Sequence, residues 1–355
     1  MIVEPGLKLW GSERALAATL KSLTEAWGRV VLVVPQGAEL ADEVRQRPDD
    51  YGPVDIREAA IGNLHKRGYR ARLFAILALA LLMIRLRPDR VYLNQAGLAR
   101  LMQPLSRLMR FPLAIHVRLI EDVPRVIHLR GTSRAPLDVI FISDAMLEAA
   151  GEIVLPVDTK WHMAYDPYPL AKFPELRSQS APFVCVGRLS QGKGPHLLVE
   201  ALSNSCFSDV TADIFGTGVD GDSYADKLTD LVKPVQNRVR LMGFHRDVML
   251  HLPAYRFLVS TSHFETLGRV IMEAWEAGLV PIVYAGSGGA AEMVRKSGGG
   301  ILFENWDAAS LSVALRRALS MPENERLHFV DEGRSWMAES LNLQGYRTAL
   351  TNILY

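Results

Sequence analysis

The sequence predicts an α/β protein built from two doubly wound, Rossmann-like domains, each with a parallel sheet. Apolar, strand-like runs alternate with helical segments over nearly all of the 355 residues, which is typical of parallel strands joined by crossover helices. A stretch rich in proline and polar residues, 169–182, separates two such series and predicts a linker. Two tandem sheets of this kind are expected to face each other across a cleft, with ligands at the carboxyl ends of the strands.

The first domain is expected over residues 1–168. Its predicted strands are Val30–Val34, Val54–Arg57, Arg90–Asn94, Leu113–Val117 and Val139–Ile142. Long helices are expected over Arg67–Leu86 and Leu98–Met109, and Pro104 predicts a kink in the second of them. Ser143 is a typical N-capping residue for the short helix that follows it.

The second domain is expected over residues 183–330 and repeats the alternation. Its predicted strands are Phe183–Val186, Ala212–Phe215, Val239–Met242, Phe257–Ser260, Val280–Tyr284 and Gly300–Phe303. A tail with a helical pattern is expected over residues 331–355.

Composition excludes several classes of protein. The formal net charge of +1 argues against a nucleic-acid binder, and 49% hydrophobic residues indicate large cores. Two cysteines, Cys185 and Cys206, make neither a disulfide framework nor a metal site, so a reducing compartment is expected. The N-terminus lacks the pattern of a signal peptide, and the longest apolar run, Leu73–Ile84, is too short to span a bilayer. We therefore expect a cytoplasmic protein.

The segment from Gly62 to Arg110 is strongly basic. Asp89 is its single acid, against Lys66, Arg67, Arg70, Arg72, Arg85, Arg87, Arg90, Arg100, Arg107 and Arg110. Apolar residues lie between these cations, a combination that suits peripheral binding to an anionic membrane, here the inner face of the cell membrane. A solvated basic face on two ordinary helices explains the pattern equally well.

The stretch from His263 to Gly278 is the centre of the predicted site. It follows a buried strand, turns at Gly268 and becomes helical, so its first helical N–H groups make an anion site. Glu265 and Glu273 bracket the turn. Acids beside an anion site repel phosphate, so these carboxylates are expected to meet hydroxyl groups, with sugar hydroxyls the obvious candidates. Alternatively, Glu265 only interacts favourably with the helix dipole, and Glu273 only forms a surface ion pair with Arg269.

A glycine-rich loop, Gly187–Gly194, follows the first strand of the second domain. Its glycines let the backbone approach a ligand, and Arg188 and Lys193 supply the positive charge that a diphosphate needs, above all as a leaving group. The loop does not have the spacing of a Walker motif. A plain glycine turn with two solvated cations remains the alternative.

A second glycine loop, Gly216–Gly221, formally matches the dinucleotide fingerprint. It follows the second strand of its domain instead of the first, so it predicts a turn facing a nucleotide, or a plain turn. An NAD-dependent oxidoreductase remains a competing class of enzyme. Asp220 and Asp222 resemble a pair of metal ligands, but no third ligand is evident, and no metal is expected.

Three further features lie near predicted strand ends. Gly11 and Ser12 open the first helix and suit either phosphate binding through backbone N–H groups or helix capping. His116 ends a buried strand, where a histidine acts as a hydrogen-bond partner, a base or a satisfied core residue. Residues 286–292, GSGGAAE, form another glycine loop before a helix.

The second half of the chain resembles the donor domain of retaining glycosyltransferases of the two-Rossmann-domain (GT-B) type, specifically family 4. Glu265 and Glu273, separated by seven residues, match the hallmark of that family. The Gly-Arg-Leu…Lys-Gly motif, the Phe-Gly-Thr-Gly loop, Gly243-Phe244 and the Gly-Gly-x-x-Glu motif at 288–292 follow the family order. The resemblance covers about Phe183–Leu319 and implies a tail that packs back on the first domain.

The resemblance implies a role for each matched residue. Arg188 and Lys193 would hold the donor diphosphate, Glu273 the ribose hydroxyls and Glu265 the donor sugar. The remaining donor-binding positions would be Gly11, Ser12, Gly216, Gly218, Phe244, Thr266, Leu267, Gly268 and Arg269. His116 resembles the histidine near the reacting centre, although its context, HVRLIED, departs from the family pattern. The family commonly has Pro-Phe-Gly where this chain has Thr266-Leu267-Gly268, and a double glycine where it has Gly11-Ser12.

The implied reaction is transfer of a sugar, with retention, from a UDP- or GDP-sugar to a glycan or lipid-linked acceptor in the synthesis of a bacterial surface polysaccharide or glycolipid. The resemblance implies no metal and no cofactor. A glycosidase is disfavoured, because its carboxyl groups lie about 5–5.5 Å apart whereas eight helical residues span about 12 Å. A non-catalytic homologue that binds sugar nucleotides remains a third alternative.

Overall fold

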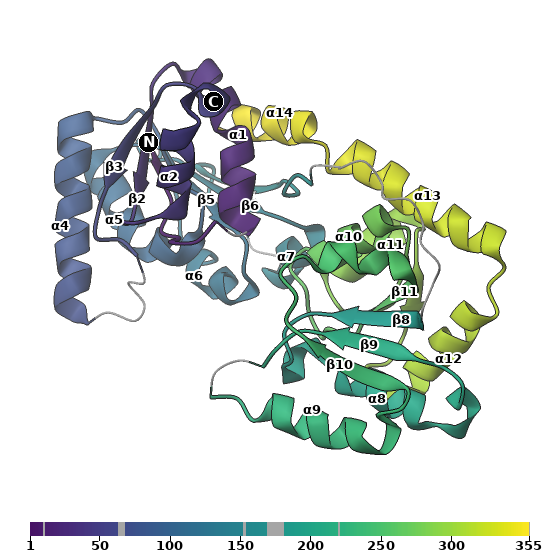
Figure 1. The fold of residues 1–355 in the computed structure, drawn as a ribbon. Helices are drawn as coiled ribbons and strands as arrows, with labels where there is room; N and C mark the ends of the chain where they lie inside the picture. The colour runs from purple at the N-terminus through teal and green to yellow at the C-terminus, as the bar shows by residue number, and fades with distance from the viewer. Residues whose placement is uncertain (10, 63–67, 152–153, 169–180, 219–220, 355) are drawn as a thin grey trace. The chain divides into compact units, whose positions relative to one another are not determined.

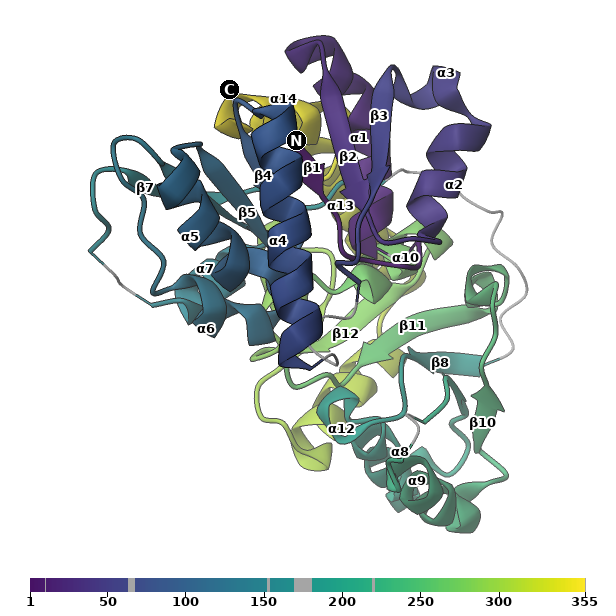
Figure 2. The same ribbon diagram turned by 90° about the vertical axis from the view of Figure 1, so that its left-hand side faces the viewer.

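The computed structural model describes residues 1–9, 11–62, 68–151, 154–168, 181–218 and 221–354. The chain forms two compact units, one from Met1–Pro167 together with Leu341–Tyr355 and one from Tyr168–Ser340 (Figures 1 and 2). Most of the expected linker, residues 169–180, lies outside the described residues. In the described part of the chain, no helix reaches the length and apolarity that crossing a membrane requires.

Unit 1 contains a seven-stranded parallel sheet in the order β3-β2-β1-β4-β5-β6-β7. Its strands are β1 (Ile2–Val3), β2 (Val30–Val34), β3 (Val54–Glu58), β4 (Val91–Leu93), β5 (Leu113–Val117), β6 (Leu137–Phe141) and β7 (Thr159–Met163). Five of these match predicted strands. The sequence analysis missed β1, which has only two residues, and β7, whose residues are polar and half-buried.

Helices cover both faces of this sheet. They are α1 (Gly11–Trp27), α2 (Glu39–Gln46), α3 (Pro48–Tyr51), α4 (Tyr69–Leu86), α5 (Ala99–Met109), α6 (Val123–Val126), α7 (Asp144–Ala149) and α14 (Leu343–Leu354). The chain moves from β1 to β2 to β3 in one direction and from β3 to β4 to β5 in the other. Right-handed crossovers therefore place α1 and α2 on one face and α4 and α5 on the opposite face.

The C-terminal helix α14 completes unit 1. Its side chains Tyr346, Leu350 and Leu354 join the core that α1 builds with the sheet, and α14 lies against α1 (Figure 1). The expected tail begins at residue 331, but in the structure only residues from Leu341 onward belong to unit 1. The preceding helix, α13 (Glu323–Ser340), packs in unit 2, where its glycine Gly333 lies against the Trp275 ring.

Unit 2 contains a six-stranded parallel sheet in the order β10-β9-β8-β11-β12-β13. Its strands are β8 (Ala181–Val186), β9 (Ala212–Phe215), β10 (Val239–Gly243), β11 (Tyr255–Ser260), β12 (Val280–Tyr284) and β13 (Ile301–Phe303). All six were predicted. The connecting helices are α8 (His196–Ser203), α9 (Tyr224–Val232), α10 (Arg269–Ala277), α11 (Gly289–Ser297) and α12 (Ala308–Leu319). The strand order reverses between β8 and β11, and such a switch point opens a crevice at the carboxyl ends of the strands.

A buried ion pair ties four parts of unit 1 together. Arg118, just after β5, holds both carboxylate oxygens of Asp166 at 2.9–3.2 Å, and both side chains are almost fully buried. Its guanidinium also donates to Asn94 Oδ1 at 2.9 Å, after β4, and to the Tyr346 hydroxyl at 3.2 Å, on α14. The pair therefore connects the strand ends of the sheet to the returning helix.

We expect Asp166→Asn to lower the free energy of unfolding by about 3–5 kcal/mol, because the substitution leaves the Arg118 charge buried without its counterion. Urea unfolding followed by circular dichroism measures this. Asp230→Asn is the matched control, since it removes the exposed Lys233–Asp230 pair and is expected to cost less than about 1 kcal/mol. Equal effects of the two substitutions would contradict the prediction.

Candidate active site

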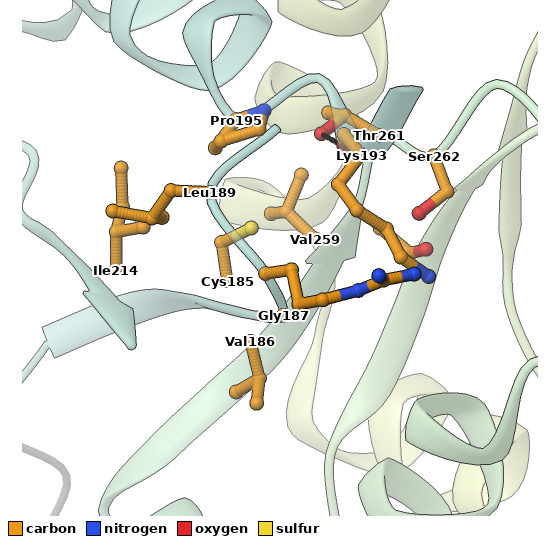
Figure 3. Close-up of a pocket in the computed structure, with 12 residues that line it drawn as sticks. Cys185, Val186, Gly187, Leu189, Lys193, Pro195, Ile214, Val259, Thr261 and Ser262 are labelled. Atoms are coloured by element: carbon orange, nitrogen blue, oxygen red, sulfur yellow. Dashed lines mark hydrogen bonds between the residues drawn. The ribbon is translucent and has the colours of Figure 1, made fainter. Parts of the chain in front are cut away.

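A pocket lies at the switch point of the unit 2 sheet, where the loops after β8 and β11 meet (Figure 3). The residues that line it come mainly from these two strands and the loops that follow them. They are Cys185, Val186, Gly187, Arg188, Leu189, Lys193, Pro195, Ile214, Val259, Ser260, Thr261 and Ser262. Burial raises the pKa of the Cys185 thiol to about 12, so this residue contributes packing and no nucleophile.

Hydrogen bonds hold the β8 loop against its neighbours on both sides. On the β11 side, Thr261 Oγ1 donates to Lys193 O at 2.9 Å (Figure 3). His263 N also donates to Gly192 O, at 2.8 Å. On the β9 side, Leu189 N donates to Thr217 O at 2.9 Å. Gly216 permits this approach, because a Cβ there would lie 1.8 Å from Gly187 O. Loop packing alone thus explains the glycine at position 216.

The two predicted phosphate ligands differ in their surroundings. The Arg188 side chain is exposed and lines the pocket. Lys193 forms an ion pair with Glu265 of the β11 loop, and both side chains are partly buried. The structure therefore joins a cation predicted to bind phosphate and an acid predicted to bind sugar hydroxyls across the switch point.

The backbone of Glu265 is fixed by the glycine loop that follows β12. Glu265 N donates to Ser287 O at 2.9 Å, and Gly289 N donates to Glu265 O at 2.8 Å. The GSGGAAE segment therefore positions the Glu265 loop, and the sequence offered no signal for this role beyond its glycines. Ser260, Thr261 and Ser262, the polar run that ends β11, were also missed as pocket residues.

The turn at Gly268 has the geometry that the sequence predicted. Gly268 is the N-cap residue of α10 and has a φ of 83°, in the left-handed region that favours glycine. An added Cβ would also lie 2.7 Å from Ala290 Cβ. Arg269 opens α10, and Thr266 and Leu267 precede the turn. The first N–H groups of α10 have no acceptor inside the helix, as an anion site requires.

Glu273 lies one turn inside α10 and is half-buried. Burial raises the pKa of its carboxyl group, and the nearby Arg269 opposes this rise. The Arg269 guanidinium lies over the Tyr168 ring, 5.6 Å from its centroid, and the Tyr168 hydroxyl donates to Glu276. Among the described residues, the Glu273 carboxylate makes no hydrogen bond, so its oxygens are available to hydroxyl groups. The sequence analysis missed Tyr168.

Phe244 follows β10, two strands away from the switch point. Its side chain is 72% exposed, whereas Phe215 of β9 is buried beneath the rings of His245 and His251. An exposed aromatic face of this kind offers a stacking surface to a flat ring. The roles predicted for Phe244, Gly216 and Gly218 in binding a donor stay predictions.

Two buried carboxylates occupy the strand ends of unit 1 beside Gly11 and Ser12. Gln95 Nε2 donates to Glu4 Oε1 at 2.6 Å and to Glu13 Oε1 at 2.9 Å, and Ser12 Oγ donates to Glu13 Oε2 at 2.9 Å. Burial, together with the charge of Glu13, raises the pKa of Glu4 to about 7. Carboxylates here disfavour a phosphate and favour hydroxyl groups, so a phosphate-binding role for Gly11 and Ser12 stays a prediction.

His116 lies inside unit 1 and is fully buried. Its Nδ1 is 2.8 Å from the Tyr92 hydroxyl, and its Nε2 has no partner among the described residues. Burial, reinforced by the Arg118 charge, lowers its pKa well below the ordinary range, so the imidazole is neutral. Full burial favours a core residue over a base, although the unpartnered Nε2 leaves this histidine incompletely satisfied. The catalytic role stays a prediction.

The described residues contain no cluster of three or more side chains that could hold a metal ion. Asp222 Oδ1 accepts a hydrogen bond from Tyr224 N at 3.0 Å and thereby satisfies an N–H group at the start of α9. Asp220, its predicted companion, lies outside the described residues. The metal independence expected from the sequence stays a prediction.

The fold, with two doubly wound α/β units, is that of the GT-B class, and a pocket lined in part by Arg188 and Lys193 lies at the switch point of the second unit. Residues 171–336 match the family described as glycosyl transferases group 1. This match covers nearly all of unit 2, and it confirms the resemblance to such glycosyltransferases that was drawn from the paired glutamates.

Solved structures share the fold over the whole chain. HepE of Anabaena, crystallised with UDP and glucose, superposes with a TM-score of 0.75 at 20% identity and covers 99% of this chain and 98% of its own. A glycosyltransferase of Rickettsia africae superposes with a TM-score of 0.77 at 15% identity, covering 99% and 97%. At these identities the likeness establishes the fold alone.

Curated relatives match only part of the chain. The lipopolysaccharide core biosynthesis glycosyltransferase LpsE of Rhizobium meliloti is 31% identical over 167 residues, which are 47% of this chain and 46% of that protein. The poly(glycerol-phosphate) alpha-glucosyltransferase of Bacillus subtilis is 28% identical over 147 residues, 41% of this chain and 21% of that protein. The matches thus span less than half the length of these relatives.

We expect the thermal stability of the protein to fall between about pH 5 and pH 7 because of Glu4. Its pKa is about 7 when folded and about 4.5 when unfolded. The stabilising effect of its proton is thus complete below the unfolded pKa and is lost as pH rises through the folded pKa. In Glu4→Gln, which keeps an uncharged side chain of the same shape, Tm is expected to change less over this range and to exceed that of the natural protein at pH 8. Parallel Tm–pH curves for the two proteins would contradict this assignment.

Proposed function

We propose that the protein is a retaining glycosyltransferase that moves a sugar from a UDP- or GDP-sugar to a glycan or lipid-linked acceptor. The Lys193–Glu265 pair supports this proposal most directly, because it places a cation and an acid side by side at the switch point of a group 1 domain. HepE, which shares the fold, binds UDP and UDP-glucose. LpsE acts in lipopolysaccharide core biosynthesis. We propose a comparable role for this chain in building a bacterial surface polysaccharide or glycolipid.

The reaction moves charge toward the diphosphate. The bond between the anomeric carbon and the donor phosphate oxygen breaks, and the acceptor oxygen bonds to that carbon on the same face. The leaving phosphate oxygen takes the acceptor's proton, so the step requires no protein base. Arg188, Lys193 and the N–H groups that open α10 neutralise the leaving group as its charge develops. Glu265 accepts hydrogen bonds from the donor sugar and Glu273 from the ribose.

Two alternatives are distinguished by simple observations. An NAD-dependent oxidoreductase would use the Gly216–Gly221 loop, but that loop follows β9 instead of the first strand, and Gly216 is required for its contact with Gly187. Binding of NAD by the pure protein would revive that alternative. A non-catalytic homologue would bind a nucleotide sugar and show neither transfer nor slow hydrolysis of it.

We expect Lys193→Ala and Glu273→Gln each to weaken binding of UDP or GDP by about tenfold or more. Each substitution removes a charged hydrogen-bonding group, and such bonds are worth about 1.5–3 kcal/mol. A thermal-shift screen of nucleotides identifies the base, and titration calorimetry then measures the affinities. Lys233→Ala is the control, because it removes an exposed lysine from the same unit. Unchanged affinity in both Lys193→Ala and Glu273→Gln would refute the site assignment.

Glu265→Gln is expected to separate binding from transfer. Without the carboxylate, Lys193 loses its partner and becomes available to the diphosphate, so UDP or GDP binds at least as tightly as to the natural protein. Sugar transfer is expected to fall by about tenfold to a hundredfold, because Glu265 no longer supplies a charged acceptor to the sugar. If Glu265→Gln weakened diphosphate binding as much as Lys193→Ala does, the pair would serve only to hold the loops.

A further inference from the structure

Helix α4 of unit 1 is apolar on two opposite faces. Ala75, Leu79 and Met83, spaced four residues apart, are fully buried against the sheet. The opposite face carries a second apolar stripe, which we call the outer stripe and which consists of Leu73, Phe74, Leu77, Leu81 and Ile84. A helix that is hydrophobic all round is normally buried all round. The outer stripe therefore needs a covering that the sheet does not supply.

The outer stripe is continuous and strongly exposed. Its five side chains are between 44% and 67% exposed. They recur at the three- and four-residue spacing that keeps them along one side of the helix. Isolated exposed leucines are ordinary on protein surfaces, but five large apolar side chains on one helical face mark an interaction surface.

Arginines lie at both ends of the outer stripe. Arg70 in the first turn and Arg85 in the last turn are both exposed, and α4 contains neither aspartate nor glutamate. Arg87 follows as the C-cap residue. On the same face of the sheet, α5 adds the exposed Leu108 and Arg110 at its own C-terminal end. The surface thus combines apolar side chains with uncompensated positive charge.

This distribution of charge favours a lipid surface over a second copy of the chain. In a symmetric antiparallel pair of α4 helices centred on Leu77, Arg70 of one copy would face Arg85 of the other, and no acid in the helix would neutralise them. An anionic bilayer satisfies both features at once. Its acyl region accepts the leucines, while its headgroup phosphates pair with the arginines at either end.

We infer that the outer stripe of α4, with Arg70 and Arg85, binds the surface of an anionic bilayer, the helix lying along the membrane plane. The buried face of α4 stays on the sheet, so only its side meets the lipid. The N-terminus of α4 follows β3 and therefore lies at the carboxyl edge of the unit 1 sheet, the edge that holds Glu4 and Glu13. A lipid-linked acceptor in that bilayer would therefore be held near this edge.

This inference goes beyond the proposed function and does not depend on it, because vesicle binding is measured without any nucleotide. The full-length protein is sedimented with vesicles of phosphatidylcholine alone or with 30% phosphatidylglycerol, at low and high salt. We expect binding to the anionic vesicles only, with loss at high salt. Leu77→Glu/Leu81→Glu and, separately, Arg70→Glu/Arg85→Glu are each expected to reduce the apparent affinity by more than about tenfold.

The control is Leu250→Glu/Val313→Glu, which places the same charges on comparably exposed apolar residues of unit 2 and is expected to leave vesicle binding unchanged. Circular dichroism and the affinity for UDP or GDP show whether each variant is folded, since both substitutions in α4 lie on its exposed side. Absence of binding to anionic vesicles, or equal binding by Leu77→Glu/Leu81→Glu, would overturn the inference. Sedimentation equilibrium showing a dimer that this variant abolishes would overturn it too, by assigning the stripe to a second copy.

Discussion

The ion pair between Lys193 and Glu265 is the contact on which the candidate active site depends. It joins the loops after β8 and β11, the two strands where the order of the unit 2 sheet reverses. Each partner neutralises the other, so both remain partly buried at little cost before a substrate arrives. A nucleotide sugar presents the complementary arrangement, a diphosphate beside a ring of hydroxyls. The mutual attraction of Lys193 and Glu265 therefore holds both side chains in place. In the proposed reaction, a donor would exchange that contact for two new ones.

The two units have the same type of parallel sheet but carry opposite charges at the carboxyl ends of their strands. At the strand ends of unit 2, exposed Arg188, Lys193 and the start of α10 make an environment for anions. At the strand ends of unit 1, Glu4 and Glu13 are buried and share Gln95 as a donor. The negative charge of these acids disfavours an anion nearby. In the proposed reaction, the donor likewise carries an anionic diphosphate, whereas the acceptor reacts through a neutral hydroxyl group.

The second domain could be predicted well from the sequence, because the glycines that its fold requires lie in the same loops as the candidate site residues. Four strands of unit 2, β8, β9, β10 and β12, end on or just before a glycine. The glycines at 268 and 216 are required by a positive φ and a close contact. The first domain was harder to predict from the sequence. The strand β1 has two residues, β7 is polar, and His116 occupies a strand end without reaching the surface. Tyr168 was missed because its role arises from a contact with α10, about a hundred residues away, which no local pattern encodes. The sequence also did not predict that α13 belongs to unit 2 and α14 to unit 1, because both segments have helical sequences and only their packing distinguishes them.

The return of α14 to unit 1 has a consequence for how the chain is made. Unit 2 is an insertion between residue 167 and residue 341 of unit 1, so the first unit is assembled from the segments on either side of it. On the ribosome, the sheet of unit 1 emerges long before Tyr346, Leu350 and Leu354, which fill its core against α1. Until α14 is synthesised, that patch of α1 stays uncovered and Arg118 lacks the Tyr346 hydroxyl. The nascent first unit therefore exposes apolar surface until that point, and a chain that ended before residue 341 would expose it permanently.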